Sequence, residues 1–148
     1  MPHTNPPDSV LRELLASSRR LAVVGASSNP DRPSYGVTRK MQQAGYAIVP
    51  VNPNEQMVLG ERAQPSLDDV APPVDIVVVF RRPEFTPPIA EQAVRLGVRA
   101  LWLQGGIVNE QAARIASDGG CIVVMDECIG VAHSRLAVGR VQPVPPTA

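Results

Sequence analysis

Short segments that are apolar at nearly every position constrain the fold of this chain more than any other feature. They span residues 21–25, 46–51, 74–80, 99–103 and 121–125. A strand with one face in water alternates apolar and polar side chains, whereas a strand covered on both faces is apolar throughout. These segments therefore predict strands of a parallel sheet that has helices on both of its faces.

Between the predicted strands, apolar residues recur at the spacing of amphipathic helices. The predicted helices span residues 9–18, 35–44, 83–96, 109–117 and 128–136. Segment 56–70 has a looser pattern, in which we expect a short strand near 62–64 and a helical turn over 66–70. Because strand and helix alternate along the chain, we predict an α/β protein: a three-layer Rossmann-like fold with a mainly parallel sheet of five to six strands.

The length of 148 residues is that of one domain. We place this domain at residues 9–137 and expect flexible tails at 1–8 and 138–148. Pro50 lies inside the second predicted strand, and a proline has no N–H to donate to a neighbouring strand. The second strand is therefore expected to be irregular or to lie at an edge of the sheet.

The charge balance and the cysteine content limit the classes of partner and compartment. Lys and Arg total 14, as do Asp and Glu, so the net charge is zero and favours neither nucleic acid nor a membrane surface as partner. No apolar run approaches the roughly 20 residues of a membrane span, and residues 1–8 lack the pattern of a signal peptide. Two cysteines, Cys121 and Cys128, are too few for a disulfide framework. We therefore expect a cytoplasmic protein with reduced thiols.

The loop that follows the first predicted strand has the features of a phosphate-binding turn. Ligands of open parallel sheets bind at the carboxyl ends of the strands. Gly25 at the strand end lets the backbone approach a phosphate, the small residues after it leave N–H groups exposed, and Arg32 can pair with phosphate oxygens. The loop is not the dinucleotide fingerprint G-x-G-x-x-G, because Ser27 stands where the second glycine belongs. The acidic residue expected about 20 positions later is also missing, since Asn52 and Pro53 follow the second strand.

Several motifs together make the chain similar to a known family. They are V-V-G-A-S (23–27), D-R-P-S-Y (31–35), V-P-V-N-P (49–53), L-G (59–60), V-D-I-V-V-V-F-R-R-P-E (74–84), W-L-Q-G-G-I-V-N-E (102–110) and V-V-M-D-E-C-I-G-V-A-H (123–133). In combination they resemble the stand-alone CoA-binding-domain proteins of bacteria and archaea, which are relatives of the CoA-binding domain of the succinyl-CoA synthetase α subunit. The resemblance covers residues 9–137.

The resemblance implies coenzyme A as the ligand and a Rossmann-like fold. It implies that the CoA diphosphate lies on the turn 25–28, that Asn52 and Pro53 border the adenosine, and that loops 80–82 and 104–105 border the thiol arm. Arg39 or Lys40 are candidates for the 3′-phosphate. The candidate cofactor-binding residues are Gly25, Ala26, Ser27, Ser28, Arg32, Ser34, Tyr35, Asn52, Pro53, Phe80, Arg81, Arg82, Gln104 and Gly105.

Three functions remain open at this point. The first is a non-catalytic module, sensor or partner protein that binds CoA or an acyl-CoA. The second is an NAD(H)-binding redox sensor or oxidoreductase on the same fold. The third is a CoA-dependent thiol- or acyl-transfer enzyme that uses Cys128 and His133, although residues five apart lie about 140° apart around a helix. We assign no catalytic residue and no metal ligand, we do not expect the ligase chemistry of the synthetase, and we consider a homodimer possible.

Overall fold

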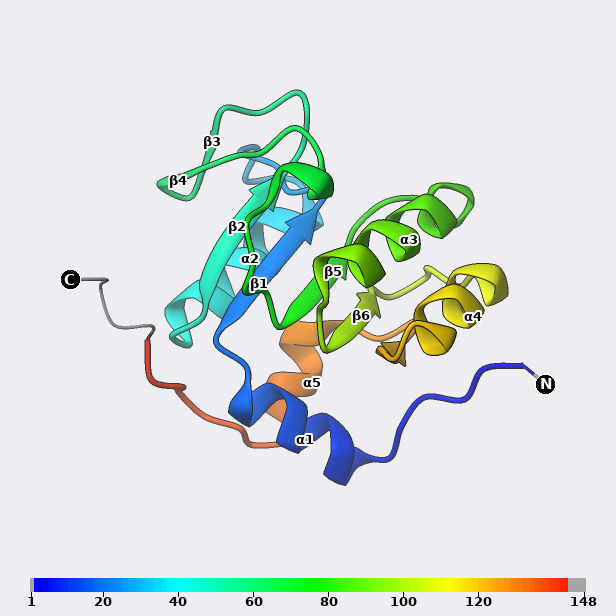
Figure 1. The fold of residues 1–148 in the computed structure, drawn as a ribbon. Coiled ribbons are helices and arrows are strands. Elements are labelled where there is room, and N and C mark those ends of the chain that lie inside the picture. Colours follow the sequence, from blue (N-terminus) through cyan, green and yellow to red (C-terminus); the bar gives the residue numbers. More distant parts are fainter. Residues whose placement is uncertain (1, 144–148) are drawn as a thin grey trace.

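The computed structural model describes residues 2–143, which form a five-stranded parallel sheet with helices on both faces (Figure 1). The order of the strands is β2-β1-β5-β6-β7, and each neighbouring pair is parallel. The strands of this sheet are β1 (Arg20–Val24), β2 (Ala47–Val51), β5 (Ile76–Val79), β6 (Ala100–Leu103) and β7 (Ile122–Val124). The helices are α1 (Asp8–Ser17), α2 (Pro33–Gln43), α3 (Thr86–Leu96), α4 (Glu110–Asp118) and α5 (Ile129–Arg135), with 3-10 turns η1 (Leu67–Asp69) and η2 (Pro83–Phe85). The prediction of a Rossmann-like α/β fold is confirmed, with five strands in the sheet.

Two apolar clusters, one on each face of the sheet, form the core. Successive side chains of a strand point to opposite faces: Leu21 and Val23 of β1 belong to one cluster, Ala22 and Val24 to the other. Helices α3 and α4 cover the face of Ala22, whereas α1, α2 and α5 cover the face of Leu21. The strands are apolar throughout because both of their faces are buried. Burial of each large apolar side chain stabilises the fold by about 1.5–3 kcal/mol.

Strand β2 lies at the edge of the sheet, as Pro50 predicted. Pro50 pairs in register with Val23 of β1. On the outer side, β2 is bonded to the segment around Gln64: the Gln64 N–H donates to the Pro50 carbonyl, and the Asn52 N–H donates to the Gln64 carbonyl, both at 2.9 Å. A proline is tolerated here because this edge does not need a continuous ladder of N–H donors.

A small antiparallel hairpin, β3 (Met57–Val58) and β4 (Glu61–Arg62), was not predicted from the sequence. The expected strand near 62–64 corresponds to β4 and to the bridge between Gln64 and Val51. Leu59 and Gly60 form the two-residue turn, both with positive φ (53° and 81°), which is the geometry that joins twisted antiparallel strands. The helical turn expected over 66–70 is η1.

Within the described residues, both expected tails contact the domain. The side chain of Asn5 donates to the Met125 carbonyl (2.8 Å) and accepts from its N–H (2.9 Å). The Val141 N–H donates to the Ala44 carbonyl at 2.8 Å, and the Val141 side chain is buried. Residues 144–148 lie outside the described part of the chain, and the boundaries 9–137 stay a prediction. None of the helices described for residues 2–143 is long and apolar enough to cross a membrane.

Candidate functional site

The strand order reverses beside β1, and a pocket opens at that point. From β1 the chain first adds β2 on one side and later β5 on the other. The carboxyl ends of β2, β1 and β5 therefore meet at one edge of the sheet, which is where parallel sheets bind ligands. The pocket there has a volume of about 720 Å³ and is lined by Val24, Gly25, Arg32, Val51, Asn52, Pro53, Asn54, Pro65, Phe80, Arg81, Arg82 and Phe85.

A second pocket of about 350 Å³ continues the first toward the start of α2. It shares five lining residues with the larger pocket, so the two form one crevice. It adds three residues of the loop after β1 and of the first turn of α2, which are Ser27, Pro33 and Ser34. The crevice thus runs from the end of β2 to the amino-terminal end of α2.

Gly25 lies where β1 ends, at a position where any other residue would lower the stability of the fold. Its φ is +88°, in the left-handed region that other L-residues enter at a cost. A β-carbon added at this position would lie 3.3 Å from the backbone carbon and oxygen of Phe80. The Gly25 N–H donates to the Val51 carbonyl at 2.9 Å. Gly25 therefore holds the ends of three strands close together beneath the crevice.

Asn52 connects the loop after β2 to the loop after β1. Its side-chain amide donates to the Ala26 carbonyl at 2.8 Å, and its side-chain oxygen accepts from the Asn54 N–H at 2.9 Å. Ala26 itself is fully buried. The Asn52 side chain is thus already used within the protein, and it fixes one wall of the crevice.

The exposed part of the loop after β1 holds a carboxylate of the chain itself. The Ser28 N–H donates to Glu55 Oε2 at 2.6 Å, and Ser28 Oγ contacts both carboxylate oxygens at 2.8 and 3.0 Å. The bond from the backbone N–H, followed by the bond from the hydroxyl, lowers the pKa of Glu55 below its usual value. Glu55 was not among the predicted site residues. The available signal was an acidic residue in the loop that follows a neighbouring strand end.

Three arginines line the crevice without a carboxylate partner. Arg32, Arg81 and Arg82 are exposed, and none of their guanidinium groups forms an ion pair within residues 2–143. The Arg81 guanidinium lies 4.5 Å from the centre of the Phe85 ring, a cation–π contact. No acidic residue is among the lining residues of either pocket. In a chain of zero net charge, this is a local excess of positive charge that suits an anion.

Most of the predicted site residues gather at this crevice. Those that line it are Gly25, Ser27, Arg32, Ser34, Asn52, Pro53, Phe80, Arg81 and Arg82. Of the others, Ala26 and Ser28 belong to the same loop, and Tyr35 lies on α2, where the Arg39 guanidinium is 5.7 Å from its ring centre. Direct contact of any of these residues with a ligand stays a prediction.

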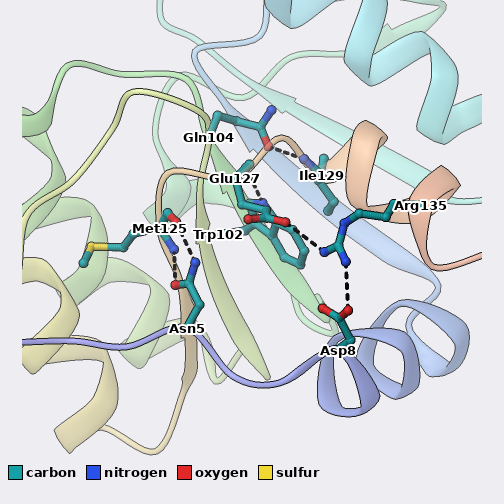
Figure 2. A network of polar contacts seen from close by, with 8 residues as sticks. All are labelled: Asn5, Asp8, Trp102, Gln104, Met125, Glu127, Ile129 and Arg135. Atoms are coloured by element: carbon teal, nitrogen blue, oxygen red, sulfur yellow. Dashed lines mark hydrogen bonds and ion pairs between the residues drawn. The ribbon is translucent and has the colours of Figure 1, made fainter.

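Gln104, Gly105 and Lys40 are not among the lining residues of the crevice. Gln104 is buried, and its side-chain oxygen accepts from the Ile129 N–H at 2.9 Å (Figure 2). Gly105 lines neither pocket of the crevice. The Lys40 ammonium donates to the Gly130 carbonyl at 2.6 Å and to the Ser134 hydroxyl, so that it is tied to α5.

The segment between β7 and α5 is held by a network of polar contacts (Figure 2). The Trp102 indole donates to the Glu127 carbonyl at 2.8 Å, and Arg135 forms ion pairs with Asp8 (2.9 Å) and Glu127 (3.0 Å). Gln104 and Asn5 add the bonds described above. The network fixes the backbone of 125–129, which presents Cys128 at the start of α5.

Cys128 and His133 do not form a thiol–imidazole pair. Cys128 lines a shallow apolar groove between α2 and α5, which also includes Pro33 and Val131. His133 is buried, with its ring 5.9 Å from the Tyr46 ring and nearly perpendicular to it. Burial lowers the pKa of His133, and its Nε2 has no hydrogen-bond partner among residues 2–143. Within residues 2–143, no cluster of three or more His, Cys, Asp or Glu side chains is placed to hold a metal ion.

Comparison with known proteins agrees with this geometry. The family model described as "CoA binding domain" matches residues 19–134. The chain is 45% identical, over 130 residues, to the uncharacterized protein YneT of Bacillus subtilis. The aligned part is 88% of this chain and 96% of that protein. A solved structure of a hypothetical protein from Pyrococcus horikoshii superposes with a TM-score of 0.86 at 33% identity, covering 93% of this chain and 99% of that one.

A more distant similarity links the chain to larger enzymes. It is 23% identical over 128 residues to the α subunit of the ADP-forming acetate–CoA ligase II of Pyrococcus furiosus. The aligned part is 79% of this chain and only 28% of that subunit. Because the family model covers most of its length and a relative of 45% identity aligns with 88% of it, the chain belongs to the CoA-binding-domain family.

Proposed function

We propose that this protein binds coenzyme A, free or acylated, in the crevice at the carboxyl ends of β2, β1 and β5. The observation that carries the proposal is the set of three arginines, Arg32, Arg81 and Arg82, that line this crevice with no acidic side chain among its lining residues. CoA carries a diphosphate and a separate 3′-phosphate. A ligand with several phosphates is the kind of anion that forked guanidinium groups bind.

The family to which the chain belongs supports CoA over other phosphorylated ligands. In the proposed complex, the loop after Gly25 and Arg32 bind the diphosphate. The family resemblance implies that loop 80–82 borders the thiol arm, but we propose that Arg81 and Arg82 bind the 3′-phosphate, because both line the same pocket as Pro53 beside the proposed adenosine position. Pro53, Pro65 and the Phe85 ring offer the apolar surfaces that an adenine ring requires. The volume of about 720 Å³ lies within the range of small-molecule sites.

NAD(H) is the weaker alternative for this crevice. Dinucleotide sites of this fold hold the ribose hydroxyls with an acidic residue after the second strand. The residues that follow β2 are Asn52 and Pro53, and the first acidic residue after them, Glu55, is bonded to Ser28. NAD also has no third phosphate for the additional arginines.

A catalytic role for Cys128 and His133 finds little support in their arrangement. The imidazole Nε2 forms no hydrogen bond with the thiol, and the ring is buried against Tyr46. A nucleophilic cysteine needs a base within hydrogen-bond reach and a group that orients the base. We therefore propose a binding module, and any transfer reaction would have to be completed by another protein.

Isothermal titration calorimetry with CoA, dephospho-CoA and NAD⁺ tests the proposal. We expect CoA to bind with a dissociation constant on the order of micromolar, and dephospho-CoA to bind about tenfold or more weakly. Arg81→Ala and Arg82→Ala should each weaken CoA binding about tenfold. Arg95→Ala is the matched control, because it removes one positive charge from an exposed ion pair with Asp68, away from the crevice.

Three results would contradict the proposal. The first is the absence of CoA binding by a protein that is folded by circular dichroism. The second is equal affinity for CoA and NAD⁺, which would mean that the crevice does not recognise the third phosphate. A loss of affinity in Arg95→Ala as large as in Arg81→Ala would show that only the overall charge matters.

A further inference from the structure

The loop expected to bind phosphate is occupied by the protein's own anion. Glu55, in the loop between β2 and β3, accepts the Ser28 N–H at 2.6 Å and the Ser28 hydroxyl at 2.8 Å. A backbone N–H and a hydroxyl that converge on one carboxylate have the geometry that also receives a phosphate oxygen. The carboxylate thus marks an anion site one residue beyond Ser27, which lines the crevice.

A carboxylate and a ligand phosphate cannot share this site. Both groups are acceptors, and one N–H cannot donate well to two of them. Both are negatively charged, and like charges a few ångströms apart repel each other. A phosphate that reaches the Ser28 N–H must therefore move the Glu55 side chain away.

The loop after β1 does not depend on Glu55 for its shape. The Ser27 hydroxyl accepts from the Asn29 N–H, and the Asn29 side chain accepts from the Asp31 N–H, both at 3.0 Å. Asn52 holds the base of the loop through the Ala26 carbonyl. Ser28 itself is exposed, so that a released Glu55 carboxylate regains water at little cost.

We propose that Glu55 is a built-in competitor for the ligand: its carboxylate occupies the Ser28 donors in the free protein and is displaced by a phosphate when the ligand binds. This inference rests on the proposed function, and it identifies Glu55 as a residue that reduces the affinity for the ligand. Removing the charge of Glu55 strengthens ligand binding, whereas loss of an ordinary structural contact at the rim of a site weakens it.

Calorimetry with Glu55→Gln, which preserves the size of the side chain, tests the inference. We expect CoA to bind about twofold to fivefold more tightly than to the unmodified protein, which is the size of one interaction between exposed charged groups. Inorganic pyrophosphate, used as a minimal probe, should gain by a similar factor. Glu61→Gln on strand β4 is the matched control, because Glu61 is exposed and the variant makes the same change in charge.

The Ser28 amide signal in a ¹⁵N-edited NMR spectrum reports the site directly. It should shift in Glu55→Gln without ligand, and it should shift on addition of pyrophosphate.

Unchanged or weaker CoA binding in Glu55→Gln relative to Glu61→Gln would overturn the competitor role while leaving CoA binding intact. Failure of every variant to bind CoA, with pyrophosphate still gaining in Glu55→Gln, would overturn the choice of CoA and retain Glu55 as an anion competitor. No response to either probe would overturn both.

Discussion

Replacement of Gly25 by alanine tests the close approach of the strand ends beneath the crevice. An L-residue at a φ of +88° costs about 1–2 kcal/mol. The new β-carbon would lie 3.3 Å from the backbone of Phe80, and the small shift that this requires adds about 1–2 kcal/mol. We therefore expect Gly25→Ala to lower the free energy of unfolding by about 2–4 kcal/mol.

The expected change in melting temperature follows from the length of the chain. Unfolding entropy is about 2.1 cal/mol/K per residue, or about 0.3 kcal/mol/K for this protein, so that Gly25→Ala should lower Tm by about 6–13 °C. Gly106→Ala separates the two contributions, because Gly106 also has a positive φ (+80°) but open space around it. It should lower Tm by about 3–6 °C. Gly105→Ala, with neither a left-handed φ nor a close neighbour, should change Tm by less than about 2 °C.

Thermal unfolding followed by circular dichroism or calorimetry measures all three variants. If Gly25→Ala melts at the same temperature as Gly106→Ala, the contact with Phe80 contributes nothing. If it melts with Gly105→Ala, the left-handed geometry of Gly25 is wrong as well. Either result would refute the close approach of Gly25 to Phe80 at the floor of the crevice.

Three further predictions concern stability. Gly36→Ala, inside α2 with no atom within 4 Å of the new β-carbon apart from chain neighbours and the backbone of its own helix, should raise the free energy of unfolding in urea by about 0.5–1 kcal/mol; a loss would mean that this position is not regular helix. Trp102→Phe should lower it by about 2–4 kcal/mol, because it leaves a cavity and an unpaired Glu127 carbonyl; a change below about 0.5 kcal/mol would contradict the burial and the indole bond. Burial raises the pKa of Tyr46 from 10.0 to about 12, so the folded state favours the neutral phenol. Its contribution to stability is complete below pH 10 and is lost as the pH rises toward 12. Urea titrations between pH 9 and 12 should show this loss in the unmodified protein and not in Tyr46→Phe. If the free energy of unfolding falls equally with pH in both proteins, the pKa of Tyr46 is not raised.

The sequence alone was sufficient for the sheet and its helices. A segment such as 76–79 is apolar at every position because both faces of its strand are buried, and its short length between turn residues favours a strand over a buried helix. The missing N–H of Pro50 likewise predicted that its strand lies at an edge of the sheet. The β3–β4 hairpin escaped prediction because its strands are two residues long, and only Val58 among them is buried. Two such short strands have no periodicity to detect.

The location of the crevice also followed from the sequence, since the carboxyl ends of parallel strands meet at one edge. That rule brought Gly25, Asn52 and Phe80 to the same place. It did not predict that Gln104 turns toward Ile129, or that Lys40 is held by α5. A residue's chemistry shows what it can bind, but its partner depends on which elements pack beside it.

The contact between Ser28 and Glu55 shows most clearly the difference between what the sequence determines and what only the tertiary structure decides. The residues are 27 positions apart, on loops that follow different strands, and neither belongs to a motif that names the other. Local patterns determine helices and strands because those depend on near neighbours in the chain. The pairing of side chains on separate loops depends on the register and spacing of strands β1 and β2, and only the tertiary structure decides these.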